Sequence, residues 1–272
     1  MPDVYSNILE ADSAIQERIA RILELRAADP QQIEFLDHYL KSFPFADESQ
    51  VLEIGCGTGA VTRALARCTF IASVVGVDPS PILLDHARIL SKEYENVQFY
   101  QADARELPFE AESFDTVVLH TALCHIPGPE KVLEEAFRVL RKDGLLVIFD
   151  GDYASTSFAI GDNDPLEAIA RAAVEVIAHD RWIVRKLPRL IRKAGFDVIG
   201  SRGYAYSAAC DAEYMLTILD RGADALEASG IISEKLALAL KEEGRIRAEQ
   251  GNFFGLITYG KLLAKKRSYT EL

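Results

Sequence analysis

The sequence predicts an α/β fold, a doubly wound and mostly parallel sheet with a helical cap. From residue 51 onward, short apolar runs alternate with amphipathic helical segments. The runs are continuously apolar, which is typical of parallel strands buried on both faces. The 272 residues are enough for one large domain, or one domain with a cap, to bury a core of its own.

Residues 1–50 are predicted to form an N-terminal helical cap segment. One helix is indicated by four apolar residues at helical spacing, with charged residues on the other face: Ile15, Ile19, Ile22 and Leu23. A second helix is expected to begin at Asp29, because Pro30 stands in its first turn and Gln32 follows three residues after Asp29. The pair Phe43-Pro44 is expected to end this helix.

The core domain is predicted to span residues 51–265. Strands are expected at 51–54, 74–77, 97–101, 116–120 and 145–149. Between them, helices are expected after residue 59 (with Val61, Leu65 and Cys68), at about 81–91 and at 130–140. Gly144 is expected to close the last of these helices as a left-handed cap.

After residue 150 the alternation of strands and helices becomes less regular, and further helices of the cap are expected. Helices are expected at about 165–179 and 186–194, followed by a strand near 196–203. Two more helices, at about 212–228 and 233–250, precede a final strand at 254–263. The two late helices lie between the last two strands, so the segment at about 208–251 is predicted to be a helical lid insertion. Residues 266–272 are predicted to be a C-terminal tail.

Composition excludes several classes of partner. Lys plus Arg number 30 and Asp plus Glu number 42, a net charge of -12 that disfavours nucleic acid. There is no run of about 18 apolar residues that would predict a membrane span. The first ten residues lack the basic-then-apolar pattern of a secretion signal. The four cysteines form no CxxC pair, so we expect neither a zinc site nor disulfides. Cysteines without disulfides are typical of a reducing compartment, so we expect a cytoplasmic location.

The stretch Val51-Leu-Glu-Ile-Gly-Cys-Gly-Thr-Gly59 predicts a ligand-binding turn between a strand and a helix. Glycine permits backbone angles that other residues avoid and lets a ligand approach the main chain. Asp78 ends the second strand, 19 positions after Gly59. In this class of sheet, ligands bind beyond the carboxyl ends of the strands, where an acid can accept hydrogen bonds from ribose hydroxyls. The two features together indicate an adenosine-type ligand.

Five segments, in order and spacing, resemble the class I S-adenosylmethionine-dependent methyltransferases, in the small-molecule branch of the ubiquinone/menaquinone-biosynthesis type (type 11). They are VLEIGCGTG (51–59), VVGVDPS (74–80), QADARELPF (101–109), FDTVVLHTALCHI (114–126) and VLRKDGLLVIFD (139–150). The resemblance implies a seven-stranded Rossmann-like sheet with an antiparallel last strand. It also implies S-adenosylmethionine as cofactor and S-adenosylhomocysteine as product.

The resemblance assigns cofactor roles to ten residues. The methionine part would lie against Gly55, Gly57 and Gly59, with Glu53 fixing the loop from beneath. Asp78, followed by Pro79, would hold the ribose hydroxyls. The adenine would be bordered by Ile82, Asp103 and Ala104, and the sulfonium by His120.

Two other functions remain open at this point. A nicotinamide-dependent oxidoreductase uses a similar turn, but its fingerprint G-x-G-x-x-G places the third glycine three positions after the second, whereas here it comes two positions after. A binding protein that holds the methyl donor without catalysis would share every motif. We expect an enzyme that moves a methyl group to an oxygen, nitrogen or carbon of a small, partly apolar metabolite.

Candidate catalytic residues are few. His120 and His125 could each take a proton from the acceptor, or could serve only in packing and hydrogen bonding. Asp150 and Asp152 could orient a polar group or stand in a solvated turn, and Cys124 is expected to be buried packing.

Aromatic side chains outside the core predict an apolar pocket for the substrate: Tyr5, Tyr153, Trp182 and Phe254. Arg26 and Arg181 could pair with a carboxylate of the donor or of the substrate, or could lie on solvated helix faces.

Overall fold

The computed structural model describes residues 3–41 and 43–267 and contains one seven-stranded sheet of order β3-β2-β1-β4-β5-β7-β6. Strand β7 runs antiparallel to both of its neighbours, and the other strands run parallel to one another. The predicted fold class is therefore confirmed. The strands are β1 (Ser49–Ile54), β2 (Ile71–Asp78), β3 (Val97–Gln101), β4 (Phe114–His120), β5 (Leu140–Ser157), β6 (Phe196–Ala208) and β7 (Gly255–Lys266).

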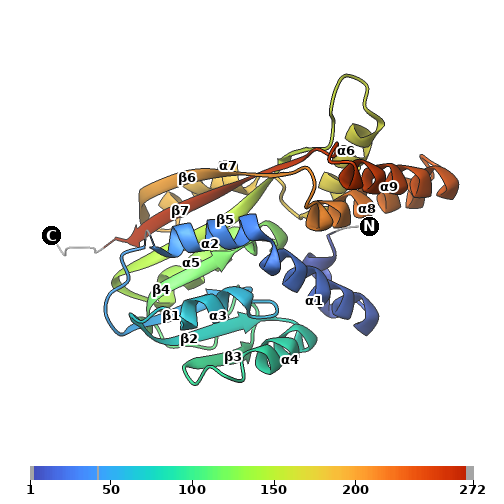
Figure 1. Ribbon diagram of the computed structural model, residues 1–272. Helices are drawn as coiled ribbons and strands as arrows, with labels where there is room; N and C mark the ends of the chain where they lie inside the picture. The colour runs from blue at the N-terminus through green and yellow to red at the C-terminus, as the bar shows by residue number, and fades with distance from the viewer. Residues whose placement is uncertain (1–2, 42, 268–272) are drawn as a thin grey trace.

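Helices cover the sheet and form the cap at its carboxyl edge (Figure 1). In chain order they are the 3-10 helix η1 (Val4–Glu10), α1 (Ser13–Ala28), α2 (Pro30–Lys41), α3 (Ala60–Ala66), α4 (Pro81–Leu90), the 3-10 helix η2 (Leu123–His125), α5 (Pro129–Val139), α6 (Pro165–Ile177), α7 (Ile183–Lys193), α8 (Glu213–Ala228) and α9 (Glu234–Glu249).

Most element ends lie within three residues of the prediction. The Asp29 carboxylate accepts hydrogen bonds from the amides of Gln31 (2.9 Å) and Gln32 (3.1 Å), as expected of the cap of α2. Cys68 lies beyond the end of α3. The largest discrepancy is β5, which runs for 18 residues, because β7 pairs with it as far as Ser157 opposite Leu256.

The prediction that Gly144 caps a helix is wrong. Helix α5 ends at Val139, and the chain passes directly into extended backbone at Leu140. The left-handed residue is Asp143, with φ 64°, and Gly144 lies within β5. A Cβ on Gly144 would stand 2.9 Å from the carbonyl oxygen of Arg141, so glycine is needed there for close approach of the backbone. Lys266 belongs to β7, and residues 268–272 of the predicted tail lie outside the described residues.

The sheet places one ligand-sized crevice at its carboxyl edge. Side chains of β1 and β4, such as Val51, Leu52, Val117 and Leu119, are fully buried because helices pack on both faces. Chain order reverses between β1 and β4, which pair in parallel. In open α/β sheets, ligands bind beyond the strand ends at this reversal.

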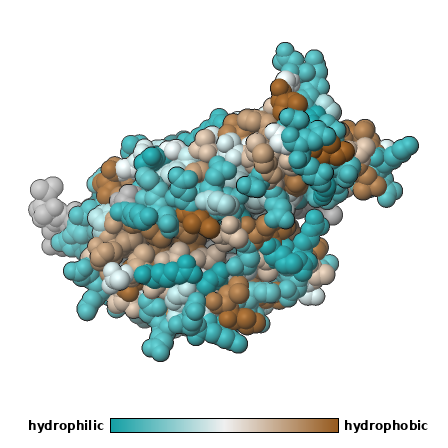
Figure 2. Space-filling model, viewed as in Figure 1, coloured by the Kyte–Doolittle hydropathy of each residue, from teal (hydrophilic) through white to brown (hydrophobic). Residues whose placement is uncertain are grey.

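Helices α8 and α9 lie between β6 and β7 in sequence, in the segment where a lid is predicted, and α8 packs against α6 and α1. They project from the carboxyl edge beside the N-terminal helix α1 (Figure 1). The visible surface is mostly hydrophilic, with apolar side chains gathered at this projecting end (Figure 2). No helix within residues 3–41 and 43–267 is long and apolar enough to cross a bilayer.

Candidate functional site

The turn from β1 to α3 forms a cradle that only glycine allows. Gly55, Gly57 and Gly59 adopt φ of 75°, 52° and 77°, which is strained for residues with a Cβ. A Cβ on Gly55 would stand 2.6 Å from Ala122 Cβ, and one on Gly57 would stand 2.9 Å from Leu23 Cδ1. Glycine is therefore required at both positions, by the positive φ and by the close approach of Ala122 and Leu23.

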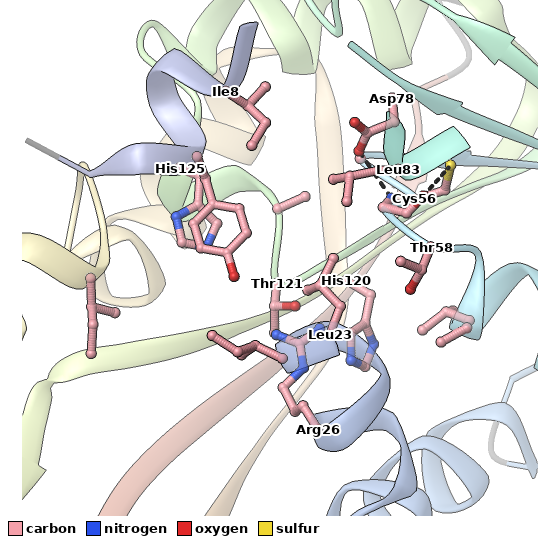
Figure 3. Close-up of a pocket in the computed structure, with 18 of the residues that line it drawn as sticks. Ile8, Leu23, Arg26, Cys56, Thr58, Asp78, Leu83, His120, Thr121 and His125 are labelled. Atoms are coloured by element: carbon pink, nitrogen blue, oxygen red, sulfur yellow. Dashed lines mark hydrogen bonds between the residues drawn. The ribbon is translucent and has the colours of Figure 1, made fainter. Parts of the chain in front are cut away.

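Asp78 forms the floor beside this turn. Its carboxylate is 7% exposed. One oxygen accepts the Gly57 amide at 2.9 Å (Figure 3), and the other accepts the Ser80 amide, also at 2.9 Å. Burial raises the pKa of Asp78 to about 6. This carboxylate therefore fixes the glycine turn and retains lone pairs for a ligand.

Glu53 lies beneath the turn, 2% exposed, and accepts a hydrogen bond from the Thr62 hydroxyl in α3. Burial, together with the charge of the nearby Asp78, raises the pKa of Glu53 to about 8. Two buried carboxyl groups thus face one end of the crevice without a lysine or arginine in salt-bridge distance among the described residues. A positively charged ligand is favoured at that end.

His120 ends β4 and is held by aromatic neighbours. Its Nδ1 lies 3.0 Å from Tyr39 Oη, and its ring stacks on Phe149 with a centroid distance of 4.7 Å. Burial and the charge of Arg26 lower the pKa of His120 well below its usual value. Arg26 reaches from α1 toward His120 and Thr121 (Figure 3). His120 is therefore neutral, and a proton added to it would meet a buried cation.

His125 is held differently, by a carboxylate from the residue that caps η1. Its Nδ1 lies 2.7 Å from Asp3 Oδ2, and the Asp3 side chain is 1% exposed. Asp3 also accepts hydrogen bonds from the Tyr5 amide, the Ser6 hydroxyl and the His179 amide. The pKa of Asp3 is lowered because the pairing with His125 outweighs the opposing effect of burial. The ionised carboxylate keeps the proton on Nδ1, so Nε2 presents a lone pair.

One cavity joins these groups. Its lining includes nine residues that the sequence predicted for the site: Tyr5, Glu53, Gly55, Gly57, Asp78, Pro79, His120, His125 and Tyr153. Asp103 and Ala104 line an adjoining hollow that shares Tyr5, Gly55, Pro79 and His125 with the first. The structure thus brings together the donor and catalytic candidates.

Two donor candidates and two substrate candidates line neither the cavity nor the adjoining hollow. Gly59 is the N-cap of α3 and faces β3, since a Cβ there would stand 2.9 Å from the Phe99 ring. At the start of α4, Leu83 lines the cavity in place of Ile82, which is only partly buried. Trp182 is 40% exposed and packs on the Arg185 guanidinium, 4.5 Å from its ring centroid. Phe254 is 37% exposed, just ahead of β7.

The remaining candidates have structural partners. Asp150 is fully buried and accepts the amides of Cys124 (3.1 Å) and Gly151 (2.9 Å). Asp152 pairs with Arg185 at 2.9 Å. Cys124 is fully buried, as expected, and Arg181 pairs with Glu175 outside the cavity.

Several lining residues were missed by the sequence analysis. Thr121, directly after β4, has φ 49°, which is unusual for a β-branched residue. Its buried hydroxyl has no hydrogen-bond partner among the described residues. Its position directly after a predicted strand is the only feature of the sequence that could have pointed to Thr121. The lid residues carry no motif at all; they are Tyr214, Thr217, Ile218 and Arg221 of α8.

These residues fit S-adenosylmethionine. The glycine cradle leaves room for the methionine part, and the orphaned Thr121 hydroxyl next to it offers a polar partner. Asp78 and Glu53 suit the ribose hydroxyls and the positive charges of the molecule. Pro79 and Leu83 give an apolar wall between Asp78 and the adjoining hollow at Asp103.

Comparisons with known proteins agree with this arrangement. Residues 52–148 match the family model described as "Methyltransferase domain". Methyltransferase GfsG of Streptomyces halstedii is 34% identical over 158 residues, 55% of this chain and 53% of its own length. Demethylmenaquinone methyltransferase of Staphylococcus saprophyticus is 28% identical over 155 residues, 57% of this chain and 63% of its own. The chain spans about half the length of such curated relatives.

A solved structure is similar in fold. The crystal structure of a putative methyltransferase from Bacillus halodurans C-125 aligns with a TM-score of 0.62 and 21% identity, over 86% of this chain and 99% of the other. At that identity the likeness concerns the fold alone. Residues 52–148 therefore match a methyltransferase domain of the type 11 branch, whose cofactor is S-adenosylmethionine.

Proposed function

We propose that the protein is an enzyme that transfers a methyl group from S-adenosylmethionine to an O–H or N–H group of a small, partly apolar molecule. The observation that carries the proposal is a single cavity that joins the glycine turn and Asp78 to the Asp3–His125 pair. Methyl transfer needs both ends, since one must hold the donor and the other the acceptor.

At the donor end, Asp78 would hold the ribose hydroxyls and the glycine turn would lie along the methionine part. Thr121 and Glu53 would supply further polar contacts, and His120, neutral and fixed by Tyr39, would border the sulfur. When bound, S-adenosylmethionine supplies an activated methyl group: the carbon–sulfur bond breaks with its electron pair staying on sulfur as the bond to the acceptor forms.

At the acceptor end, His125 is a better proton acceptor than His120. His125 lines the cavity, its Nε2 would take the proton, and the Asp3 carboxylate would stabilise the imidazolium formed when the acceptor loses its proton. Protonation of His120 is opposed by burial and by Arg26. The walls of the cavity would position the acceptor. Positioning alone can lower the activation free energy of a reaction by roughly 7–11 kcal/mol. Helix α8 and η1, which line the cavity, would exclude water.

Donor binding is tested first, by calorimetry with S-adenosylmethionine and separately with a nicotinamide dinucleotide. We expect heat with the sulfonium compound only. Asp78→Ala should weaken its binding at least about tenfold, because it loses hydrogen bonds to a charged group. Asp85→Ala, on the exposed face of α4, is the control. Dinucleotide binding without donor binding would contradict the proposal and favour an oxidoreductase.

Turnover is tested with methyl-labelled donor and the small-molecule fraction of a cell extract. We expect label in a metabolite, reduced about 10²-fold or more in His125→Gln with donor affinity unchanged. His120→Gln should reduce turnover less. Tight donor binding with no labelled product would leave only a binding protein, which is the alternative function.

A further inference from the structure

Arg221 of α8 faces the cavity with part of its guanidinium unused. Its Nη2 donates to the Val176 carbonyl at the end of α6, at 3.0 Å, and its Cζ lies 5.8 Å from the centroid of the Tyr5 ring. The side chain is half-buried and lines the cavity. Within residues 3–41 and 43–267, it forms no salt bridge. Its remaining N–H groups are therefore available on the cavity side.

The lack of a counter-ion at Arg221 contrasts with the other arginines of the lid. The neighbouring Asp220 is 2.8 Å from Arg245, and Arg247 pairs with Asp164 at 2.6 Å. Asp220, next to Arg221 in sequence, is thus engaged elsewhere, although the whole chain carries a net charge of -12. A half-buried cation without a counter-ion is unfavourable, so an anion that enters the cavity would find a prepared site.

A second arginine, Arg26, also lines the cavity without a salt bridge among the described residues. It lies between the two ends, since its charge acts on His120 and it also interacts with Tyr153 and Tyr214. Leu23, one turn earlier on α1, packs against Gly57. Glu24 pairs with Arg63 at 2.8 Å, and Arg63 donates to the Thr58 carbonyl at 2.7 Å. Helix α1 is therefore fastened to the glycine turn. The donor carries one carboxylate, which we assign to Arg26 because α1 is fastened to the turn that would hold the methionine part.

Arg221 lies at the other end, beside the proposed base. It contacts the Tyr5 ring, which in turn packs on the His125 ring with a centroid distance of 4.4 Å. Its charge also helps to lower the pKa of Asp3. Around it the cavity wall is apolar or hydroxyl-bearing, from Tyr153, Ile177, Tyr214, Thr217 and Ile218.

We propose that the methyl acceptor is an organic oxyanion, a carboxylate or a phosphate monoester, whose acid group binds Arg221. Guanidinium N–H groups match both kinds of anion. The apolar and tyrosine side chains would hold the body of the molecule and bring its O–H or N–H group to His125. This inference rests on the proposed function, whose acceptor end it specifies.

The test uses matched probes with S-adenosylhomocysteine present: 4-hydroxyphenylacetate against 4-hydroxyphenylacetamide, and phenyl phosphate against phenol. In calorimetry, we expect the anion of at least one pair to bind about tenfold or more tightly than its neutral match. The pair that shows the difference distinguishes carboxylate from phosphate. Arg221→Gln should abolish the difference, whereas Arg171→Gln, on the exposed face of α6, should retain it. No preference for either anion, or a preference that survives Arg221→Gln, would overturn the proposal.

A second arm separates the acceptor from the donor. Methylthioadenosine lacks the amino-acid part of S-adenosylhomocysteine, so only the latter can use a cation at the donor end. Arg221→Gln should leave both affinities unchanged. If it weakens S-adenosylhomocysteine but not methylthioadenosine, Arg221 binds the donor carboxylate and the proposal is wrong. If the wild-type protein binds neither nucleoside, the proposed function fails, whatever the anion probes show.

Discussion

The buried carboxyl of Glu53 makes a prediction about stability and pH. In the ligand-free protein this group lies 2% exposed beneath the glycine turn, and its pKa is raised to about 8. In the unfolded chain its pKa would be the usual 4.5. Between these values the folded state binds more protons than the unfolded state. The free energy of unfolding should therefore fall as the pH rises from about 4.5 to about 8, and level off above it.

The substitution Glu53→Gln removes the titration and keeps the shape. Each pKa unit corresponds to roughly 1.4 kcal/mol, so ionising Glu53 in the fold costs about 4–5 kcal/mol between the two plateaus. The glutamine side chain cannot ionise, and its amide oxygen can still accept the Thr62 hydroxyl. We expect the variant to match the wild type near pH 4.5 and to be more stable by several kcal/mol at pH 9.

Urea unfolding at pH 5, 7 and 9, without ligand, measures the effect. Glu93→Gln, at an exposed turn after α4, is the matched control and should follow the wild type at every pH. Asp78, whose pKa is raised to about 6, gives its own loss of stability at lower pH, between 3.8 and about 6, and this part should persist in Glu53→Gln. An unchanged slope between pH 6 and 9 in Glu53→Gln would refute the reasoning.

Three further predictions concern the rest of the cavity and the lid. Asp3→Asn should lower turnover about tenfold or more, because His125 loses the carboxylate that would stabilise its imidazolium form; unchanged kinetics would make Asp3 a cap of η1 only. Thr121→Val should weaken S-adenosylhomocysteine binding about tenfold in calorimetry without lowering the melting temperature, since the hydroxyl has no partner in the described fold. Gly222→Ala should destabilise the protein by about 1–3 kcal/mol in thermal unfolding, because a Cβ there would collide with Ile169 of α6; Gly161→Ala, in an exposed loop with no atom near its Cβ position, should not.

The parts of the fold that the sequence predicts well are those whose signals are local. Strand β3 occupies 97–101, as expected, because its run of residues is bounded on both sides by turns. The extension of β5 past residue 149 depends instead on β7, about a hundred residues later. Ser155 illustrates this dependence, since its hydroxyl accepts the Thr258 amide at 2.9 Å. No window of sequence around residues 150–157 contains that partner.

The candidate site shows the same difference between residues that local motifs predict and residues that depend on distant segments. The residues at the donor end follow directly from strand ends, as Gly55 follows β1 and Asp78 closes β2, so a short motif is enough to find them. The acceptor end is assembled from distant segments. Asp3 and His125 are 122 positions apart, and Arg221 comes from a lid helix whose face is set by its packing on α6. Helical spacing predicts that α8 exists but not which of its polar residues turns inward.

The two ends of the cavity also differ in charge, and this difference constrains what can bind. Glu53 and Asp78 have raised pKa values in the ligand-free protein, so a cation at the donor end would favour their ionised forms and would be held by them. Arg221, at the acceptor end, favours an anionic ligand instead. A neutral acceptor would satisfy the apolar wall but leave the half-buried guanidinium without an ion-pair partner, whereas an anion would neutralise it. Specificity at the acceptor end therefore follows from Arg221, because a matched neutral molecule leaves its charge without a counter-ion.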